Sequence, residues 1–159
     1  MPNFILPIFA IIISSIIPLS ALAAQSDGQE GHGGDIAVSI FVGIAYKTAA
    51  CLAESPESLK DYPLLLEDFN LAIARTSIYS VEKTVLNGNE VDAINYPTVE
   101  APRILINRNR WLDDRLSTDM RALLVFHEYL SIAGYDDSSY KISYAYINKN
   151  KACINQGEK

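Results

Sequence analysis

One short stretch in the last third of the chain gathers residues whose types and spacing could do chemistry. His127 is followed directly by Glu128, and Gly134 and Asp137 come after them. Two histidines four positions apart share one face of a helix, so both imidazoles can reach a single zinc ion. A glutamate next to the first histidine can then act as the base on a metal-bound water. In this chain, however, the position four residues after His127 is Ser131.

The stretch reads H-E-x-x-S-x-x-G-x-x-D. It resembles the H-E-x-x-H-x-x-G-x-x-H/D motif of the metzincin group of zinc metallopeptidases, over residues 127–137 only. The resemblance implies that His127 and Asp137 are zinc ligands and that Glu128 is the catalytic base. It also implies that Gly134 is the turn that brings the last ligand back. Ser131 stands where the second ligand belongs, and a hydroxyl is a poor zinc ligand.

Two further side chains are candidate accessory ligands. His32 is the other of the two histidines in the chain, and Asp136 precedes Asp137. A zinc-dependent peptidase with a weak or absent zinc site is therefore one hypothesis. If the protein is such a peptidase, its cofactor is zinc. If it is not, we expect no cofactor.

The same residues also fit interpretations without a metal. In the first, His127 is a half-buried histidine on the core face of a helix, bonded by a backbone carbonyl or a tyrosine hydroxyl, and Glu128 pairs with Arg121 or a lysine. In the second, Ser131 is a nucleophile with His127 as base and Asp137 as the group that orients it. A serine inside a helix more commonly bonds to the carbonyl four residues earlier.

The N-terminal part of the chain predicts export. Residues 4–24 carry no charge and end in small residues, which is typical of a secretory signal peptide over residues 1–24. An uncleaved membrane anchor is the alternative, because the run is just long enough to span a bilayer. Residues 25–35 are polar and glycine-rich and predict a flexible lead-in. A single domain over residues 36–159 is expected to follow, located in the periplasm or outside the cell.

Charge and cysteine content narrow the function further. The net charge of −6 excludes a broad electrostatic attraction to nucleic acid. The arginines between residues 103 and 121 alternate with aspartates, which predicts a solvated, salt-bridged surface. The two cysteines, Cys51 and Cys153, are expected to form a disulfide in an oxidising compartment.

The hydrophobic pattern predicts an α+β domain. Helices are expected over residues 36–54, 64–75 and 118–133, the last capped by Ser117 and ended by Gly134, with a short C-terminal helix after Asp136. Strands are expected over residues 77–86, 90–96 and 103–107, with a hairpin turn at Asn87-Gly88-Asn89. These strands predict a small antiparallel sheet of about three strands.

A second resemblance spans most of the mature chain, after the expected signal peptide. The segments Gly33-Gly34-Asp35, Leu124–Leu130 and Tyr140–Ser143 resemble a group of small exported proteins of predatory bacteria. That resemblance implies export and a single domain, and it implies no substrate. The function that we expect from the sequence is a small exported, non-catalytic module that binds an unknown protein or envelope component. Contact with the membrane is expected only through the N-terminal segment, if it is not cleaved.

Overall fold

The computed structural model describes residues 35–55, 62, 64, 66–98 and 100–156. The helices are α1 (Ile36–Glu54), α2 (Leu66–Arg75), α3 (Arg108–Trp111), α4 (Thr118–Ile132) and α5 (Lys141–Ile154). The strands are β1 (Ser77–Val81), β2 (Thr84–Leu86), β3 (Asn89–Val91), β4 (Ala93–Tyr96) and β5 (Arg103–Asn107). The α+β architecture is confirmed. The predicted signal peptide and all of the lead-in except Asp35 lie outside the described residues.

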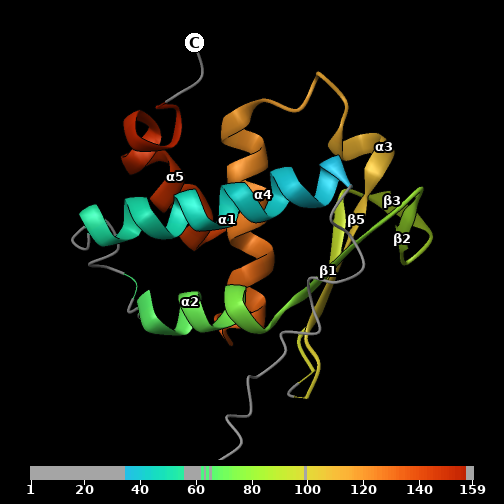
Figure 1. Cartoon of the computed structure of the whole chain (residues 1–159), viewed down its shortest axis with the longest axis horizontal. Helices are drawn as coiled ribbons and strands as arrows, with labels where there is room; N and C mark the ends of the chain where they lie inside the picture. Colours follow the sequence, from blue (N-terminus) through green and yellow to red (C-terminus); the bar gives the residue numbers. More distant parts are fainter. Residues whose placement is uncertain (1–34, 56–61, 63, 65, 99, 157–159) are drawn as a thin grey trace, which may run out of the picture.

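Helix α4 is the centre of the domain. It contacts α1, α2 and α5 as well as strand β4, and Figure 1 shows α1 and α2 crossing it with the sheet to one side. Nine of its residues are buried: Ala122, Leu123, Leu124, Val125, Phe126, Glu128, Tyr129, Leu130 and Ile132. Met120, near its start, is exposed. A helix that is surrounded by neighbours is apolar on most of its circumference rather than on one stripe.

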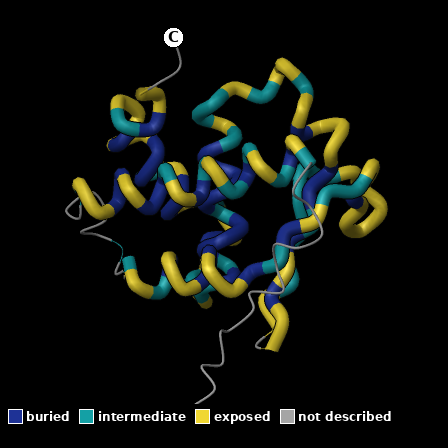
Figure 2. The backbone as a smooth tube through the Cα atoms, in the orientation of Figure 1, coloured by how far each residue is buried: buried dark blue, intermediate teal, exposed yellow. Residues whose placement is uncertain are grey.

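A chain of aromatic rings holds the helices together. Phe41 of α1 lies 5.1 Å from Trp111 of α3 between ring centroids, and Phe126 of α4 lies 4.6 Å from Tyr146 of α5. Phe69 of α2 contacts Phe126 edge to face, at 5.0 Å. Tilted and edge-to-face pairs at these distances stabilise beyond the area they bury, by about 0.5–1.5 kcal/mol each. These rings form the buried centre of the molecule, which Figure 2 shows where the helices cross.

The sheet differs from the antiparallel arrangement that we predicted. Its strand order is β1-β5-β4, with β1 parallel to β5 and β4 antiparallel to β5, while β2 and β3 form a separate hairpin. The Asn87-Gly88 turn of this hairpin has positive φ at both residues, as a tight hairpin turn requires. The predicted strand over residues 77–86 is broken after Val81, so β1 lies in one sheet and β2 in the other. A continuous alternating pattern does not reveal such a break.

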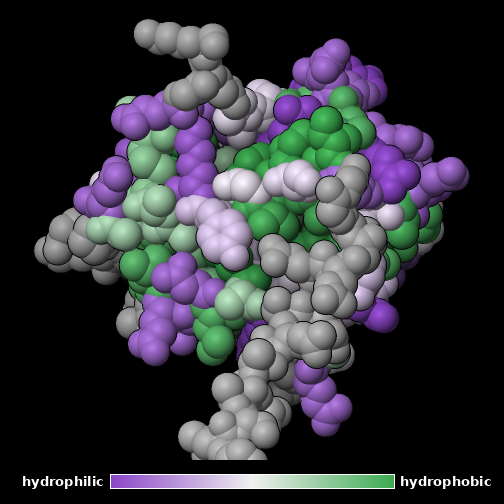
Figure 3. Space-filling model, in the orientation of Figure 1, coloured by the Kyte–Doolittle hydropathy of each residue, from purple (hydrophilic) through white to green (hydrophobic). Residues whose placement is uncertain are grey.

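Helix α1 begins at the predicted residue because Asp35 caps it. The Asp35 side chain accepts hydrogen bonds from the backbone N–H groups of Ala37, at 2.9 Å, and Val38, at 3.4 Å. α1 is the one helix of the described part that is long and apolar enough to cross a membrane. Its buried residues nevertheless belong to the core, and Ile36 and Tyr46 are exposed on the outer side. Apolar and weakly polar residues accordingly follow its course on the face seen in Figure 3.

The disulfide between Cys51 and Cys153 is confirmed and joins α1 to α5. Two hydrogen bonds support the same contact. The Tyr146 hydroxyl donates to the Thr48 carbonyl at 2.8 Å, and Lys47 Nζ donates to the Gln156 carbonyl at 2.7 Å. Helix α5 runs past the short helix that we expected, to the residue after Cys153, with a kink at Asn150, where the backbone is not helical.

Candidate functional site

The motif helix ends as predicted, at a glycine in the left-handed region. Gly134 has φ +88° and donates to the Ser131 carbonyl, while Tyr135 donates to the Leu130 carbonyl at 2.9 Å. These two bonds form a Schellman motif, which satisfies the last carbonyls of α4. The turn sends the chain back toward His127 and places Asp137 beside it.

His127 and Asp137 are brought together. The distance from His127 Nδ1 to Asp137 Oδ2 is 3.1 Å, and the side chains are 16% and 1% exposed. Burial opposes ionisation of Asp137, but hydrogen bonds from His127, Ser143 and the backbone of α5 outweigh it and hold its pKa below the usual range. An ionised carboxylate only accepts hydrogen bonds, so we assign the imidazole proton to Nδ1. Nε2 is then the basic nitrogen of the ring.

The second oxygen of Asp137 caps the next helix. Asp137 Oδ1 accepts from the N–H of Ile142 at 2.7 Å and from the N–H of Ser143 at 3.4 Å, at the start of α5. An anion is stabilised there by the free N–H groups and by the helix dipole. Asp137 therefore connects α4 to α5 through one buried carboxylate.

Tyr140 completes this corner in an unusual conformation. Its φ is +57°, in the left-handed region that a bulky residue rarely adopts. Its ring stacks on the His127 imidazole with 3.9 Å between centroids and 15° between planes. The strain of this backbone conformation is thus held by the contact with His127, and such strain concentrates at functional sites.

Glu128 is bonded to the sheet. Glu128 is 5% exposed, and its Oε2 accepts a hydrogen bond from Asn95 Nδ2 of β4 at 2.6 Å. Burial raises its pKa, and the charge of Asp92 raises it further, while the bond from Asn95 and the charge of His127 act against this. The predicted pairing of Glu128 with Arg121 or a lysine is wrong, because its partner among the described residues is Asn95, and Arg121 Nη2 donates to the Asp113 carbonyl.

Ser131 faces the same asparagine. Its Oγ donates to Asn95 Oδ1 at 2.9 Å rather than to the His127 carbonyl four residues earlier. Asn95 thus bonds two residues one turn apart on α4 and fastens that helix to β4. The link from serine to histidine that a nucleophilic triad needs is not made, because the hydroxyl is directed to Asn95.

The candidate ligands within the described part of the chain do not assemble a complete zinc donor set. Among the described residues, no group of three or more His, Cys, Asp or Glu side chains could hold a metal ion. Asp137 Oδ2 is hydrogen-bonded to His127 Nδ1, an arrangement in which a carboxylate orients a histidine ring. Asp136 is exposed and accepts from the Ser138 N–H at 3.1 Å, and His32 lies outside the described part. The assignment of His127 and Asp137 as metal ligands stays a prediction.

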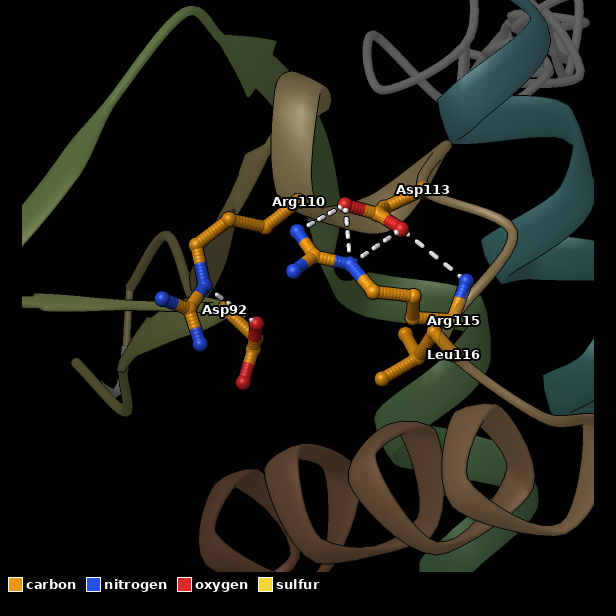
Figure 4. A pocket seen from close by; sticks show the side chains of 5 residues that line it. All are labelled: Asp92, Arg110, Asp113, Arg115 and Leu116. Carbon is orange, nitrogen blue, oxygen red and sulfur yellow. Dashed lines mark hydrogen bonds and ion pairs between the residues drawn. The ribbon is translucent and has the colours of Figure 1, made fainter.

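Next to the motif lies a charged cavity of about 310 Å³. Its lining residues come from the β3–β4 bend, from α3 and from the loop between α3 and α4: Asp92, Arg110, Asp113, Arg115 and Leu116. Figure 4 shows two ion pairs on opposite sides of it, Asp92 with Arg110 and Asp113 with Arg115. The cavity and the motif are linked along the chain, because Asp92 lies three residues before Asn95, the hydrogen-bond partner of Glu128. The salt bridges predicted for this region include Arg115 with Asp113, whereas Arg110 pairs with Asp92 of the β3–β4 bend.

The walls of the cavity are fixed from inside the protein. Asn107 is fully buried, its N–H donates to the Asp92 carbonyl at 2.9 Å, and its Oδ1 caps α3 by accepting from the Arg110 N–H at 3.2 Å. One buried side chain and its backbone therefore position both members of the Asp92–Arg110 pair. On the other side, Arg121 of α4 holds the Asp113 carbonyl at 3.1 Å.

Sequence reasoning missed Asn95, Asn107 and the binding partners of Tyr140. The signal for Asn107 was present, because an asparagine after a strand and before a helical turn is a common N-cap. Asn95 carried no signal, since its role depends on a contact with α4 that only the fold creates. The chain matches no protein-family model, no curated protein and no solved structure.

Proposed function

We propose that this protein is an exported, non-catalytic binding module that uses its zincin-like helix as a scaffold. The observation that carries the proposal is the hydrogen bond between Glu128 and Asn95. The residue that would act as base in a peptidase is buried and accepts a 2.6 Å hydrogen bond from Asn95, which ties α4 to β4. A base must reach the proton it abstracts, and this carboxylate is directed into the protein interior.

The hydrogen bonds of His127 and Asp137 support the same proposal. Asp137 Oδ2 is bonded to His127 of α4 at 3.1 Å, and Asp137 Oδ1 accepts a hydrogen bond from the N–H of Ile142 in α5. These two bonds fix the positions of α4 and α5 relative to each other. The disulfide between Cys51 and Cys153 supports export, because such bonds persist in oxidising compartments. We place the protein in the periplasm or outside the cell, with a small molecule, protein or envelope component as its partner.

Zinc content separates this proposal from the degenerate metallopeptidase. We expect the oxidised protein, dialysed at neutral pH after loading with zinc, to retain less than about 0.1 zinc per chain, since intact zinc sites hold the metal tightly. Ser131→His, which restores the missing imidazole, is the matched comparison. One zinc per wild-type chain, together with peptidase activity that Glu128→Gln abolishes, would establish the enzyme instead.

A thermal-shift screen tests the binding half of the proposal. The screen uses small charged molecules, including amino acids, phosphate, citrate and polyamines. A ligand at about 100 times its Kd stabilises the folded state by about 2.7 kcal/mol, which raises Tm by several degrees. We expect at least one ligand to do so in the wild type and to lose its effect in Arg110→Met. A screen without any shift would contradict the binding of a small charged molecule.

A further inference from the structure

The geometry points to a ligand class: we propose that the Asp92–Arg110 cavity binds a free α-amino acid with an apolar side chain. This inference rests on the binding function proposed above and names its ligand. The volume of about 310 Å³ lies at the lower end of the range of about 300–1,000 Å³ that is usual for small-molecule sites. A cavity of this size suits a small ligand rather than a protein segment.

The balance of charge around the cavity selects a ligand that carries both signs. Two guanidinium groups and two carboxylates line it, in the pairs Asp92–Arg110 and Asp113–Arg115. A simple anion would meet the two carboxylates, and a simple cation would meet the two guanidinium groups. Like charges brought together across a binding site oppose association, so a ligand with one charge of each sign is favoured over either.

Because Asp92 and Arg110 lie close together, they favour a ligand whose positive and negative groups are also close together. Arg110 Nε donates to Asp92 Oδ1 at 2.6 Å. The terminal nitrogens of Arg110 and the other oxygen of Asp92 make no further hydrogen bond within the described part of the chain. An α-amino acid carries its carboxylate and its ammonium on one carbon, so it can bond Arg110 and Asp92 at the same time. Guanidinium binds carboxylate through two parallel hydrogen bonds, which adds geometric specificity.

The pair is prearranged for this contact. Asn107 holds the backbone of Asp92 and of Arg110 by bonds of 2.9 and 3.2 Å from a fully buried position. A ligand therefore meets side chains on a fixed frame, and less ordering accompanies binding. The Asp92–Arg110 pair itself is partly exposed, with the Arg110 side chain 45% and the Asp92 side chain 24% exposed, so the ligand has access to both.

The remaining lining residue, Leu116, favours a ligand with an apolar side chain. Leu116 is the apolar member of the cavity wall, next to the Asp113–Arg115 pair. An apolar side chain on the ligand gains from removing this surface from water, whereas a charged one would approach one of the two ion pairs. L-Leucine is therefore a suitable probe.

Calorimetric titration of the oxidised protein with three matched probes tests the proposal. L-Leucine carries both charges, N-acetyl-L-leucine lacks the ammonium, and L-leucinamide lacks the carboxylate. We expect L-leucine to bind with a Kd below about 1 mM and each derivative to bind at least about tenfold more weakly, the usual effect of losing a charged hydrogen bond. Inorganic phosphate is the fourth probe.

Three variants make the test specific. Arg110→Met keeps the length of the side chain and should weaken L-leucine at least about tenfold. Asp92→Asn should weaken L-leucine but leave N-acetyl-L-leucine nearly unchanged, because only the ammonium is affected. Arg103→Met is the matched control, since Arg103 lies at the far end of β5, with its guanidinium 4.7 Å from the Tyr96 ring centroid, and should bind L-leucine as the wild type does.

The outcomes separate this inference from the proposed function. Equal binding of the three leucine probes, or tighter binding of phosphate, overturns the amino-acid ligand. If another molecule of the thermal-shift screen binds in an Arg110-dependent way and L-leucine does not, the ligand class is wrong and the binding function stands. If nothing binds, the amino-acid ligand and the binding of any small charged molecule are both wrong.

Discussion

At the scale of single residues, Glu128 decides how the motif is interpreted. Burial raises its pKa above the usual value, so the folded state binds this proton more tightly than the unfolded state. The stability that this group contributes is therefore present at low pH and is lost as the pH rises through its folded-state pKa. Near pH 7 an ionised Glu128 is a buried charge compensated only in part by Asn95.

Two substitutions of Glu128 are expected to change the free energy of unfolding in opposite directions at pH 7. Glu128→Gln keeps an oxygen for the Asn95 amide and removes the buried charge, so it should be at least as stable as the wild type at pH 7 and lose this advantage at pH 4. Glu128→Ala leaves that amide without its acceptor and should lower the free energy of unfolding by about 1–3 kcal/mol. Urea denaturation at both pH values measures this. A glutamine variant less stable than the alanine variant would contradict the scaffold role.

At the scale of elements, the turn from α4 to α5 depends on Tyr140. Its left-handed conformation disfavours any side chain, whereas its ring stabilises the turn by stacking on His127. The two effects oppose one another at one position. Their sizes can be separated by substitutions that remove one effect at a time.

The expected order of stability is Tyr140→Phe, then Tyr140→Gly, then Tyr140→Ala. Phenylalanine keeps the stacked ring and should match the wild type within about 0.5 kcal/mol. Glycine loses the stacking but adopts positive φ freely, while alanine loses the stacking and keeps the strain. Glycine should therefore exceed alanine by about 1–2 kcal/mol, the usual penalty of left-handed backbone. Thermal denaturation of the three variants measures the order, and alanine more stable than glycine would show that the turn relaxes.

The elements also show what the sequence could reveal. The start of α1 and the end of α4 follow from Asp35, Ser117 and Gly134, because caps are local signals that act on neighbouring backbone. The parallel pairing of β1 with β5 could not be predicted, since it arises from contacts between segments far apart in the chain. The site divides in the same way. His127 and Asp137 were found because they are ten residues apart, whereas the bond from Asn95 to Glu128 joins two elements that only the fold brings together.

At the scale of the whole molecule, the disulfide closes nearly the entire described chain into one loop. Its cysteines are 102 residues apart, and a loop of about that length implies a stabilisation of about 4.7 kcal/mol in the chain-entropy model. α1 and α5 also remain joined through the bond from Tyr146 to Thr48. Cys51→Ser/Cys153→Ser should thus keep the native circular dichroism spectrum and lose about 2–5 kcal/mol of unfolding free energy in urea. Wild-type protein reduced with dithiothreitol is the control and should match it. A loss of native structure in the double variant at zero urea would contradict the prediction.

Asp35 connects three parts of the molecule and should make its stability depend on pH. It caps α1 and also accepts hydrogen bonds from Ser80 of β1 and from Arg108 of α3. The bond from Ser80, with further help from Arg108 and the N–H groups of α1, lowers its pKa from 3.8 to about 2. Because the folded-state pKa lies below the unfolded one, the stabilisation is present above about pH 4 and is lost as the pH falls toward 2.

Asp35→Asn should therefore be less stable than the wild type at pH 6, and the difference should shrink steadily between pH 4 and pH 2. Asp114→Asn is the matched control, since Asp114 is exposed and makes no ion pair with the described residues. Urea midpoints across this range give the measurement, and a difference that stays constant from pH 6 to pH 2 would show that the charge of Asp35 does not hold these elements together.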